Sequence, residues 1–419
     1  MTNGHDEVID LGLLGKLLKQ LEESTVGTVI AKLDPRIINE LRELIRFMHR
    51  REPRIMLVGR RGAGKSSLVN AMLGVKARNV GSVTVGSLDC KWEDVGPEEK
   101  RLRVLDTKGT GQGDEVAGEA KSALELLKSE IRRECPDVIV YVCKAKEVDA
   151  NVRFDLEFLN QVVEFTRKTY AVDSCPVLAV VNQVDELDPA HVTTPPFEDP
   201  VKRENMQRAV EHLGEMFKMH YRYYADDKIV IRPICSYMYF QDGHLACDRR
   251  WQIDELLDEI LALLPDEALL SMMKLGRFQE VRRKLSNRIV NTFTMATGII
   301  GAEPIPYADL PILTSLQVSM IGMIQAVAGR GASMRNIRDF LAATGINITG
   351  AFTVREVVRA LVKLLPGAGS LISGTVAAGY TKLIGTTAIN HFIEGDEIGK
   401  ATAKAEQATG RAWTRGVSA

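Results

Sequence analysis

The stretch GRRGAGKSSLVN at residues 59–70 decides what kind of fold this 419-residue chain adopts. It satisfies the pattern GxxxxGK[ST] through Gly59, Gly64, Lys65 and Ser66. Glycines allow backbone N–H groups to turn toward phosphates, the lysine reaches the β- and γ-phosphates, and the hydroxyl binds Mg²⁺. An apolar run precedes the stretch and a helical pattern follows it. The stretch therefore predicts a phosphate-binding loop at the positive N-terminal end of a helix.

Beyond residue 53, apolar strand-like runs alternate with helical patterns. The predicted strands are 54–58, 102–105, 137–143, 176–181 and 228–234. The predicted helices are 65–73, 115–133, 152–169, 201–221 and 252–263. Residues 88–93 are a candidate antiparallel edge strand. This alternation predicts an α/β fold, a mostly parallel sheet with helices on both faces.

Helical patterns flank this region on both sides. Residues 8–22 and 37–50 predict two N-terminal helices, and Pro265 closes the α/β region. The chain beyond Pro265 is predicted to be all-α. Residues 310–329 contain no charged side chain, which raises the question of a membrane span. We favour a packed amphipathic helix over membrane contact, because one face carries an apolar stripe and polar residues dilute the rest. The stripe consists of Leu313, Leu316, Met320, Met323 and Val327.

Two short motifs follow predicted strands in the order that a guanine-nucleotide site requires. DTKG at 106–109 follows one strand, so Asp106 is expected to hold Mg²⁺ through water and the Gly109 N–H to meet the γ-phosphate. NQVD at 182–185 follows another strand. Its Asp185 is expected to accept hydrogen bonds from the N1–H and N2–H₂ edge of guanine, which adenine cannot supply. Asn182 is expected to tie this loop to the phosphate loop or to contact the base N7. The alternative is that the chain binds ATP, and in that case the NQVD motif would occur here by chance.

Further residues complete the predicted site. The predicted nucleotide-binding residues are Gly59, Arg60, Arg61, Gly62, Ala63, Gly64, Lys65, Ser66, Ser67, Asp106, Gly109, Asn182, Gln183, Asp185 and Ser236. The predicted metal ligands are Ser66, Thr84 and Asp106, and the predicted catalytic residues are Lys65, Thr84 and Arg61. Thr84 is the switch candidate that offers Mg²⁺ a second hydroxyl. Arg60 and Arg61 either face solvent or stabilise γ-phosphate charge, in their own site or across a dimer.

With these motifs, GRRGAGKSSLVNAMLG, DTKG and NQVD, the chain resembles the translation-factor-related GTPases on their Era-like, dynamin-like and immunity-related side. The resemblance implies a P-loop G domain that binds GTP and GDP with Mg²⁺ and hydrolyses GTP. Two positions depart from the family pattern. Gln183 stands where the guanine motif NKxD has lysine, and Thr110 follows DTKG where Ras-like proteins have the glutamine that positions water. Gln112 is close but shifted, so the rate of hydrolysis is expected to be low.

The C-terminal region carries a second resemblance. Residues 304–321 and 363–392 are similar to a helical domain of unassigned role that follows the G domain in a group of bacterial Era-like GTPases. Pro366 and Gly367 are expected to break two helices into a hairpin. Small residues allow close approach of helices, either in a membrane-associated hairpin or in tight soluble packing. These small residues are Gly369, Ser373, Ala377 and Gly385.

Charge and cysteine content bound the remaining possibilities. The net charge of −1 gives no general attraction to nucleic acid, and none is expected as a partner. Residues 265–419 carry 17 Lys and Arg against 11 Asp and Glu, a net charge of +6, which fits a solvated face or an anionic membrane surface. The six cysteines form no CxxC pair and the N-terminus has no secretory pattern, so we expect a cytoplasmic protein, peripherally membrane-associated at most.

The predicted domains are an N-terminal helical region at 1–50, a GTP-binding domain at 51–265 and a helical domain at 266–419. The predicted function is a GTP-dependent switch with slow hydrolysis. Its helical domain engages a partner, a second protomer or a membrane surface. The alternative is a nucleotide-binding interaction module with little or no hydrolysis.

Overall fold

The computed structural model describes residues 35–48, 51–78, 90–97, 100–107, 117–149, 152–225, 227, 229–276, 278–302, 309–329, 334–344 and 374–409. The chain divides into two compact units. One is Arg51–Arg277, and the other combines Met1–Arg50 with Phe278–Ala419. The first unit thus extends past Pro265, while the assignment of domains by function stays a prediction. The helix predicted at 8–22 and the predicted break at Pro366 lie outside the described residues.

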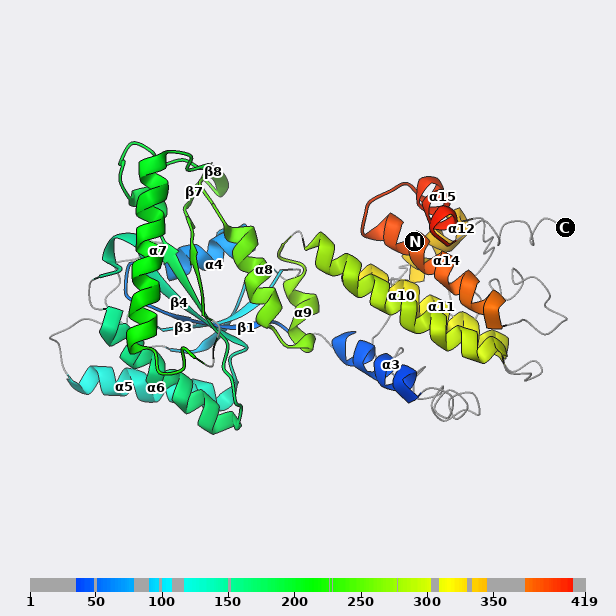
Figure 1. The fold of residues 1–419 in the computed structure, drawn as a ribbon, viewed down its shortest axis with the longest axis horizontal. Helices are drawn as coiled ribbons and strands as arrows, with labels where there is room; N and C mark the ends of the chain where they lie inside the picture. The colour runs from blue at the N-terminus through cyan, green and yellow to red at the C-terminus, as the bar shows by residue number, and fades with distance from the viewer. Residues whose placement is uncertain are drawn as a thin grey trace. The chain divides into compact units, whose positions relative to one another are not determined.

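A six-stranded sheet forms the centre of the unit at 51–277, in the order β2-β3-β1-β4-β5-β6 (Figure 1). Its strands are β1 (Arg54–Val58), β2 (Trp92–Val95), β3 (Leu102–Asp106), β4 (Val138–Lys144), β5 (Val177–Asn182) and β6 (Val230–Pro233). All neighbouring strands are parallel except β2 and β3, which are antiparallel. The predicted mostly parallel sheet is confirmed. The edge strand begins at Trp92, inside the last residues of the expected range.

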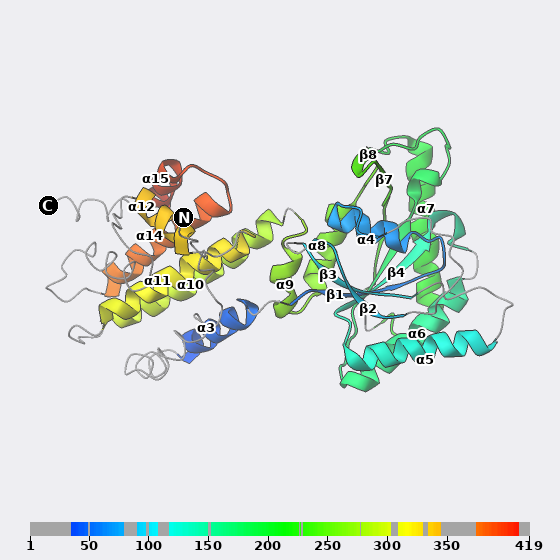
Figure 2. The ribbon, with the colours of Figure 1, turned by 180° about the vertical axis from the view of Figure 1, so that it is seen from behind.

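Helices cover both faces of this sheet, which is why β4 and β5 are apolar and buried along almost their whole length. The helices of this unit are α4 (Lys65–Leu73), α5 (Ala117–Arg133), α6 (Val152–Tyr170), α7 (Pro200–His220), α8 (Ile253–Leu263) and α9 (Asp266–Met272). Buried side chains of α5, α6 and α7 share one core with alternate residues of the strands. The remaining helices α4 and α8 contact each other on the opposite face (Figure 2).

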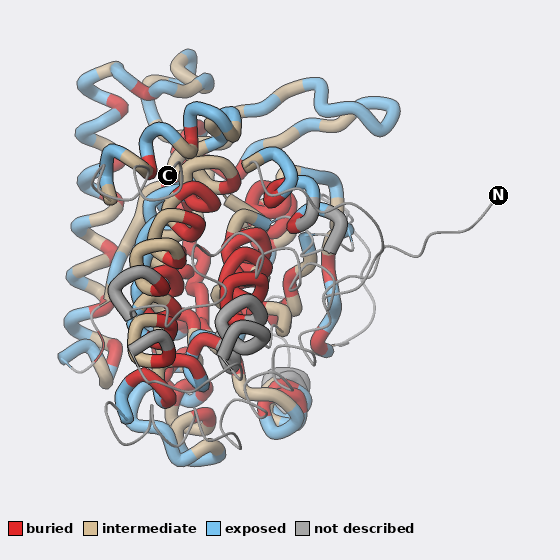
Figure 3. Tube along the Cα trace, turned by 90° about the vertical axis from the view of Figure 1, so that its right-hand side faces the viewer, coloured by how far each residue is buried: buried red, intermediate tan, exposed pale blue. Residues whose placement is uncertain are grey.

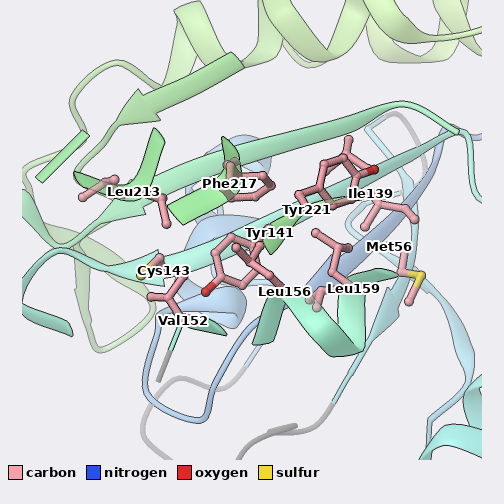
Figure 4. Packing of buried hydrophobic residues seen from close by; sticks show 14 of the residues in the cluster. Met56, Ile139, Tyr141, Cys143, Val152, Leu156, Leu159, Leu213, Phe217 and Tyr221 are labelled. Atoms are coloured by element: carbon pink, nitrogen blue, oxygen red, sulfur yellow. The ribbon is translucent and has the colours of Figure 1, made fainter. Parts of the chain in front are cut away.

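Two aromatic rings lie within the core that the strands share with α5, α6 and α7 (Figure 4). Tyr141 of β4 and Phe217 of α7 pack edge to face, with ring centroids 5.7 Å apart and planes at 69°. Both rings are fully buried, with Leu159 of α6 in the same cluster. The Tyr141 hydroxyl donates to the Asp155 carboxylate at 3.1 Å, so the ring is buried without an unpaired polar group. This contact joins the core to an acidic residue near the candidate site.

A β-hairpin that the strand pattern above does not predict follows β6. Strands β7 (Met238–Gln241) and β8 (His244–Asp248) form a separate two-stranded sheet. Asp242 and Gly243 join them with φ values of 50° and 81°. A two-residue Asp-Gly turn is a strong signal for a hairpin, so the sequence contained enough information to predict this element.

Helices α3 (Pro35–Met48) and α10 to α15 form the second unit. The latter are α10 (Gln279–Ala302), α11 (Asp309–Val327), α12 (Met334–Ala343), α14 (Gly374–Phe392) and α15 (Ile398–Thr409). Although far apart in sequence, α3 and α10 are in contact, and Arg288 of α10 bridges Glu40 and Glu43 of α3 at 2.7 and 2.6 Å. Buried positions line the faces that the helices turn toward one another (Figure 3).

Helix α11 differs from the expected amphipathic helix, because residues 316–327 are buried on every side. It packs against α10, α12 and α14, and both polar and apolar positions between residues 316 and 327 are buried. Gln317, which is 1% exposed, donates its side-chain amide to the Thr381 hydroxyl of α14 at 3.0 Å. Among the described residues, no helix is both long enough and apolar enough to cross a bilayer.

A glycine sets the spacing of three helices in this unit. A Cβ atom on Gly385 of α14 would lie 2.6 Å from Val290 Cγ2 of α10 and 3.1 Å from Met320 Sδ of α11. The close approach expected of the small residues therefore holds at Gly385, and Ala377 is buried nearby on the same helix. The other two small residues, Gly369 and Ser373, lie outside the described residues.

Replacing Gly385 with alanine should destabilise the helical unit by about 1–3 kcal/mol, the usual cost of overpacking a close helix contact. The matched control is Gly399→Ala on α15, where a Cβ atom meets nothing within 4 Å. That change should be neutral or stabilise by about 0.4–1 kcal/mol. Urea unfolding of both variants measures the difference. Equal free energies of unfolding would contradict the packing described here.

Candidate functional site

The phosphate-binding loop predicted at 59–65 runs from β1 to α4 and requires glycine at two points. A Cβ on Gly59 would lie 2.2 Å from the Val142 carbonyl oxygen of β4. A Cβ on Gly64, where φ is 90°, would lie 2.3 Å from Asn182 Nδ2. In both places another strand or loop passes too close for a side chain. The loop is therefore shaped by the tertiary structure on both of its flanks.

Helix α4 begins directly at the end of this loop. Its N-cap is Gly64, which has no side chain to bond the amides of the first turn. Ser66 and Ser67 lie in that first turn. Uncapped amides and the helix dipole together make the start of the helix suitable for an anion. This is the position that a phosphate group would take.

Lys65 is buried inside the loop. Its side chain is 8% exposed, and Nζ donates to the carbonyl oxygens of Gly59 and Arg60 at 2.7 and 3.0 Å. Burial lowers the pKa of Lys65, while Asp106 and Asp155 act in the opposite direction. The ammonium thus sits among loop carbonyls, with no carboxylate within bonding distance in the described part of the chain. A phosphate would be a strongly preferred partner for it.

The loop after β5 is bonded to the phosphate loop by two side chains. Asn182 Nδ2 donates to the Ala63 carbonyl at 2.9 Å, and its Oδ1 accepts from the Ser236 hydroxyl at 2.9 Å. Gln183 Nε2 donates to the Gly62 carbonyl at 2.8 Å. Asn182 is fully buried and Ser236 is 3% exposed. Three of the predicted site segments therefore meet, although strand β4 lies between β1 and β5.

Gln183 makes a specific contact in the position where the family pattern has lysine. Its amide nitrogen bonds the phosphate loop, and its φ of 65° places the residue in the left-handed region. Its Oε1 is buried and has no hydrogen-bond partner among the described residues. The side chain keeps a bridge between the two loops without adding a positive charge.

Asp185 is 8% exposed and lies against two buried residues. Lys202 of α7, fully buried, donates from Nζ to the main-chain oxygens of Asp185 and Leu187 at 2.7 and 2.5 Å. Burial lowers the pKa of Lys202, and Asp185 opposes this effect. The second buried neighbour of Asp185 is Cys235. Burial is the main reason that the pKa of its thiol is raised to about 12, and the negative charge of Asp185 adds to the rise, so Cys235 remains a neutral thiol. Lys202 therefore fixes the backbone at Asp185, the predicted base-reading residue, and at Leu187, two residues further on.

Asp106, the predicted metal ligand, lies at the end of β3. Its Oδ2 accepts from Arg78 at 2.8 Å, whereas its buried Oδ1 has no hydrogen-bond partner among the described residues. An unpaired buried carboxylate oxygen fits a water molecule bound to Mg²⁺, since hard cations prefer oxygen ligands. The next residue, Thr107, is buried and bonds the Leu57 carbonyl of β1 through N and Oγ1 at 3.1 and 2.9 Å.

The two arginines of the loop differ in their surroundings. Arg60 Nε donates to both oxygens of Asp155 on α6, at 3.2 and 3.0 Å. Burial raises the pKa of Asp155, while Arg60 and the Tyr141 hydroxyl oppose the rise. Arg61 is exposed. Thr84 and Gly109, the other predicted contacts of metal and γ-phosphate, lie outside the described residues.

Four residues that shape this site were absent from the sequence prediction. They are Asn70, Arg78, Asp155 and Lys202, which bond the Arg78 backbone, the Asp106 carboxylate, the Arg60 guanidinium and the Asp185 backbone respectively. The separation of the partners in sequence ranges from 7 residues for Asn70 and Ala77 to 95 residues for Arg60 and Asp155. No local pattern marks such pairs.

Comparison with known proteins supports the same type of domain. Residues 54–183 match the model of the family described as 50S ribosome-binding GTPase. This segment is therefore similar to the GTP-binding domains of that family. The match covers less than half of the chain and does not reach the helical unit. No curated protein sequence matches this chain.

Solved structures resemble the chain only in fold. Era from Aquifex aeolicus bound to GDP·AlF4⁻ is 22% identical, with a TM-score of 0.33, and the match covers 60% of this chain and 69% of that one. Toc33 from Arabidopsis thaliana with Mg²⁺ and GMPPNP is 17% identical, with a TM-score of 0.34, covering 54% of this chain and 92% of that one. A probable GTP-binding protein engB is 18% identical, with a TM-score of 0.31, covering 50% and 97% respectively.

Replacing Lys202 with methionine should weaken GDP binding about tenfold, because two buried carbonyls of the base loop would lose their donor at about 1–3 kcal/mol. Titration calorimetry measures the affinity. Lys168→Met is the matched control, since Lys168 is an exposed lysine paired with Glu164 on α6. An affinity equal to that of the wild type would show that Lys202 does not hold the base loop.

Proposed function

We propose that this chain is a GTP-dependent switch that binds GTP and GDP with Mg²⁺ and hydrolyses GTP slowly. The observation that carries the proposal is the direct bonding of the NQVD loop to the phosphate loop, through Asn182 to Ala63 and Gln183 to Gly62. A base reader and a phosphate cradle must lie one nucleoside apart to hold one ligand. These two contacts support that spacing.

Lys65, the loop amides and the start of α4 form the phosphate end of the proposed site. Lys65 exchanges its contacts with the loop carbonyls for the β- and γ-phosphates, and the amides of residues 62–67 bond the remaining oxygens. Such charge-assisted bonds are about twice as strong as neutral ones. The phosphates therefore account for most of the affinity and little of the base selectivity.

Asp185 selects guanine at the other end of the site. Its two carboxylate oxygens accept from N1–H and N2–H₂, while Asn182 and Ser236 complete the pocket around the base. Gln183 supports the base from the side of the phosphate loop. Adenine offers neither donor at these positions, so its nucleotides would leave the buried Asp185 charge unpaired, which is costly.

The residues present fit a magnesium ion at the phosphate end. Ser66 would bind it directly through its hydroxyl, Asp106 would bind one of its waters through Oδ1, and Thr84 would supply a second hydroxyl. Bound there, the ion would neutralise charge on the β- and γ-phosphate oxygens. Ser66 and Asp106 would orient it, and the adjacent turn of Thr107 is fixed on β1.

Arg61 is the proposed arginine for transition-state charge, assisted by Lys65 and Thr84. Arg60 is held by Asp155, whereas Arg61 is exposed and can approach a γ-phosphate in its own site or in a second protomer. The absence of glutamine directly after DTKG supports a low rate. The alternative, a nucleotide-binding module that hardly hydrolyses GTP, rests on that same departure.

The helical unit is the proposed output of the switch, acting on a partner, a second protomer or a membrane surface. Residues 265–419, which include most of this unit, carry a net charge of +6, and that charge supports contact with an anionic surface in the cytoplasm. Leu316, Met320, Met323 and Val327 of the apolar stripe of α11 are already buried. Contact with lipid would therefore be peripheral and electrostatic at first.

Asp185→Asn tests the base assignment. The new amide places a donor opposite guanine N2–H₂, which leaves a buried donor unpaired at about 1–3 kcal/mol. Xanthine has a carbonyl there, so the variant should bind GTP about tenfold more weakly and gain affinity for xanthosine triphosphate. Fluorescence titration with both nucleotides measures the exchange.

Two further variants make this result interpretable. Lys65→Ala should lose affinity for both nucleotides, because it removes a phosphate contact. Glu186→Gln changes an exposed carboxylate one residue away and should bind as the wild type does. An unchanged GTP affinity of Asp185→Asn would show that NQVD does not bind the base. The chain would then be a P-loop protein that binds another nucleotide.

Arg61→Ala tests the hydrolytic step under single-turnover conditions with Mg²⁺. We expect the rate to fall about tenfold or more with the GTP affinity nearly unchanged, since the contact would form mainly in the transition state. Arg153→Ala, at an exposed arginine of α6, is the matched control. If the wild type produces no GDP beyond the uncatalysed rate, the binding-module alternative is correct.

A further inference from the structure

Asp106, the proposed metal ligand, also belongs to an ion-pair cluster with Arg78 and Glu93, two residues outside the predicted site. The Arg78 guanidinium donates from Nη1 to Asp106 Oδ2 at 2.8 Å and from Nη2 to Glu93 Oε2 at 2.7 Å. The Arg78 and Asp106 side chains are 13% and 17% exposed, whereas Glu93 on β2 is 61% exposed. One arginine thus links a half-buried site carboxylate with a carboxylate at the surface.

Asn70 of α4 fixes the backbone that carries this arginine. Its Oδ1 accepts from the main-chain N–H groups of Ala77 and Arg78 at 2.9 and 2.7 Å, and its Nδ2 donates to the Arg78 carbonyl at 2.9 Å. Asn70 is 2% exposed. Arg78 is therefore held by the same helix whose first turn carries Ser66, and its place beside the metal site is built into the fold.

The two oxygens of the Asp106 carboxylate have different surroundings. Oδ2 is bonded to Arg78, and the buried Oδ1 has no partner among the described residues. A guanidinium and a divalent cation on the two oxygens of one carboxylate would share a single negative charge and repel each other. Glu93 offers the guanidinium another acceptor close by.

We propose that Arg78 competes with Mg²⁺ for Asp106, and that Glu93 sets the strength of this competition by drawing the guanidinium away. This inference rests on the proposed function, in which Asp106 receives Mg²⁺ through water. When the metal site fills, Arg78 shifts its charge toward Glu93 and the surface. The magnesium requirement of nucleotide binding is then a property of this triad as well as of the metal ligands.

Two variants should change the requirement in opposite directions. Arg78→Gln removes the competing charge, so the Mg²⁺ concentration for half-maximal GDP binding should fall about fivefold, at the low end of ordinary coupling between linked sites. Glu93→Gln leaves Asp106 as the only carboxylate bonded to Arg78, so the requirement should rise by about the same factor. Arg78→Lys keeps the charge and should stay within about twofold of the wild type.

Titrating MgCl₂ into each variant with a fluorescent GDP analogue measures the requirement, and titration in EDTA gives the metal-free affinity. The metal-free affinity should be unchanged, because the base and the phosphate loop are untouched. Arg103→Gln is the matched control. Arg103 bridges Asp94 and Glu134 beside the same sheet, so its loss should lower stability without changing the magnesium requirement. Thermal unfolding confirms that each variant is folded.

The result separates this inference from the function on which it rests. A wild type that binds GDP with Mg²⁺, together with an unchanged or increased requirement in Arg78→Gln, overturns the competition; an increase would mean that Arg78 orients Asp106 instead. A lower magnesium requirement in Arg78→Gln together with a higher one in Glu93→Gln would establish the competition. A wild type that binds no guanine nucleotide overturns the proposed function itself.

Discussion

The side-chain amide of Asn182 is the contact on which the candidate site depends. Its nitrogen bonds the Ala63 carbonyl of the phosphate loop, and its oxygen accepts from Ser236 at the end of the β6 segment. Because β4 separates β1 from β5, the backbone alone does not join these loops. Gly64 is required at the same place, since a Cβ there would occupy the position of the amide. Phosphate cradle and base loop are thus one rigid structure.

Buried positive charges stabilise both halves of that structure in the same way. Lys65 and Lys202 each donate to two backbone carbonyls, and burial lowers the pKa of both. The two arginines near the site are instead held by carboxylates, Arg60 by Asp155 and Arg78 by Asp106. In the proposed site, a nucleotide would meet the Lys65 ammonium, which can exchange its loop carbonyls for phosphate. Lys202 would keep its contacts with the carbonyls of Asp185 and Leu187.

The helical unit is built from two segments of the chain. Since α3 packs with α10, the unit at 51–277 is inserted between two segments of one helical unit. Two connections, at Arg50–Arg51 and Arg277–Phe278, therefore link them. Within the helical unit, close packing at Gly385 and the buried bond between Gln317 and Thr381 favour one arrangement of α10, α11 and α14.

The sequence by itself determined the features that depend on neighbouring residues. These are the phosphate loop, the parallel strands with their covering helices, and the order of DTKG and NQVD after strands, because glycine spacing and apolar periodicity are local signals. The tertiary structure decided what depends on distant partners. It brought Lys202 under Asp185, Asp155 to Arg60 and Arg78 to Asp106, and it buried the polar side of α11 that the pattern had assigned to solvent. A residue's type shows that it can pair, but only the folded chain places an acceptor within hydrogen-bond distance and removes the water that would otherwise satisfy it.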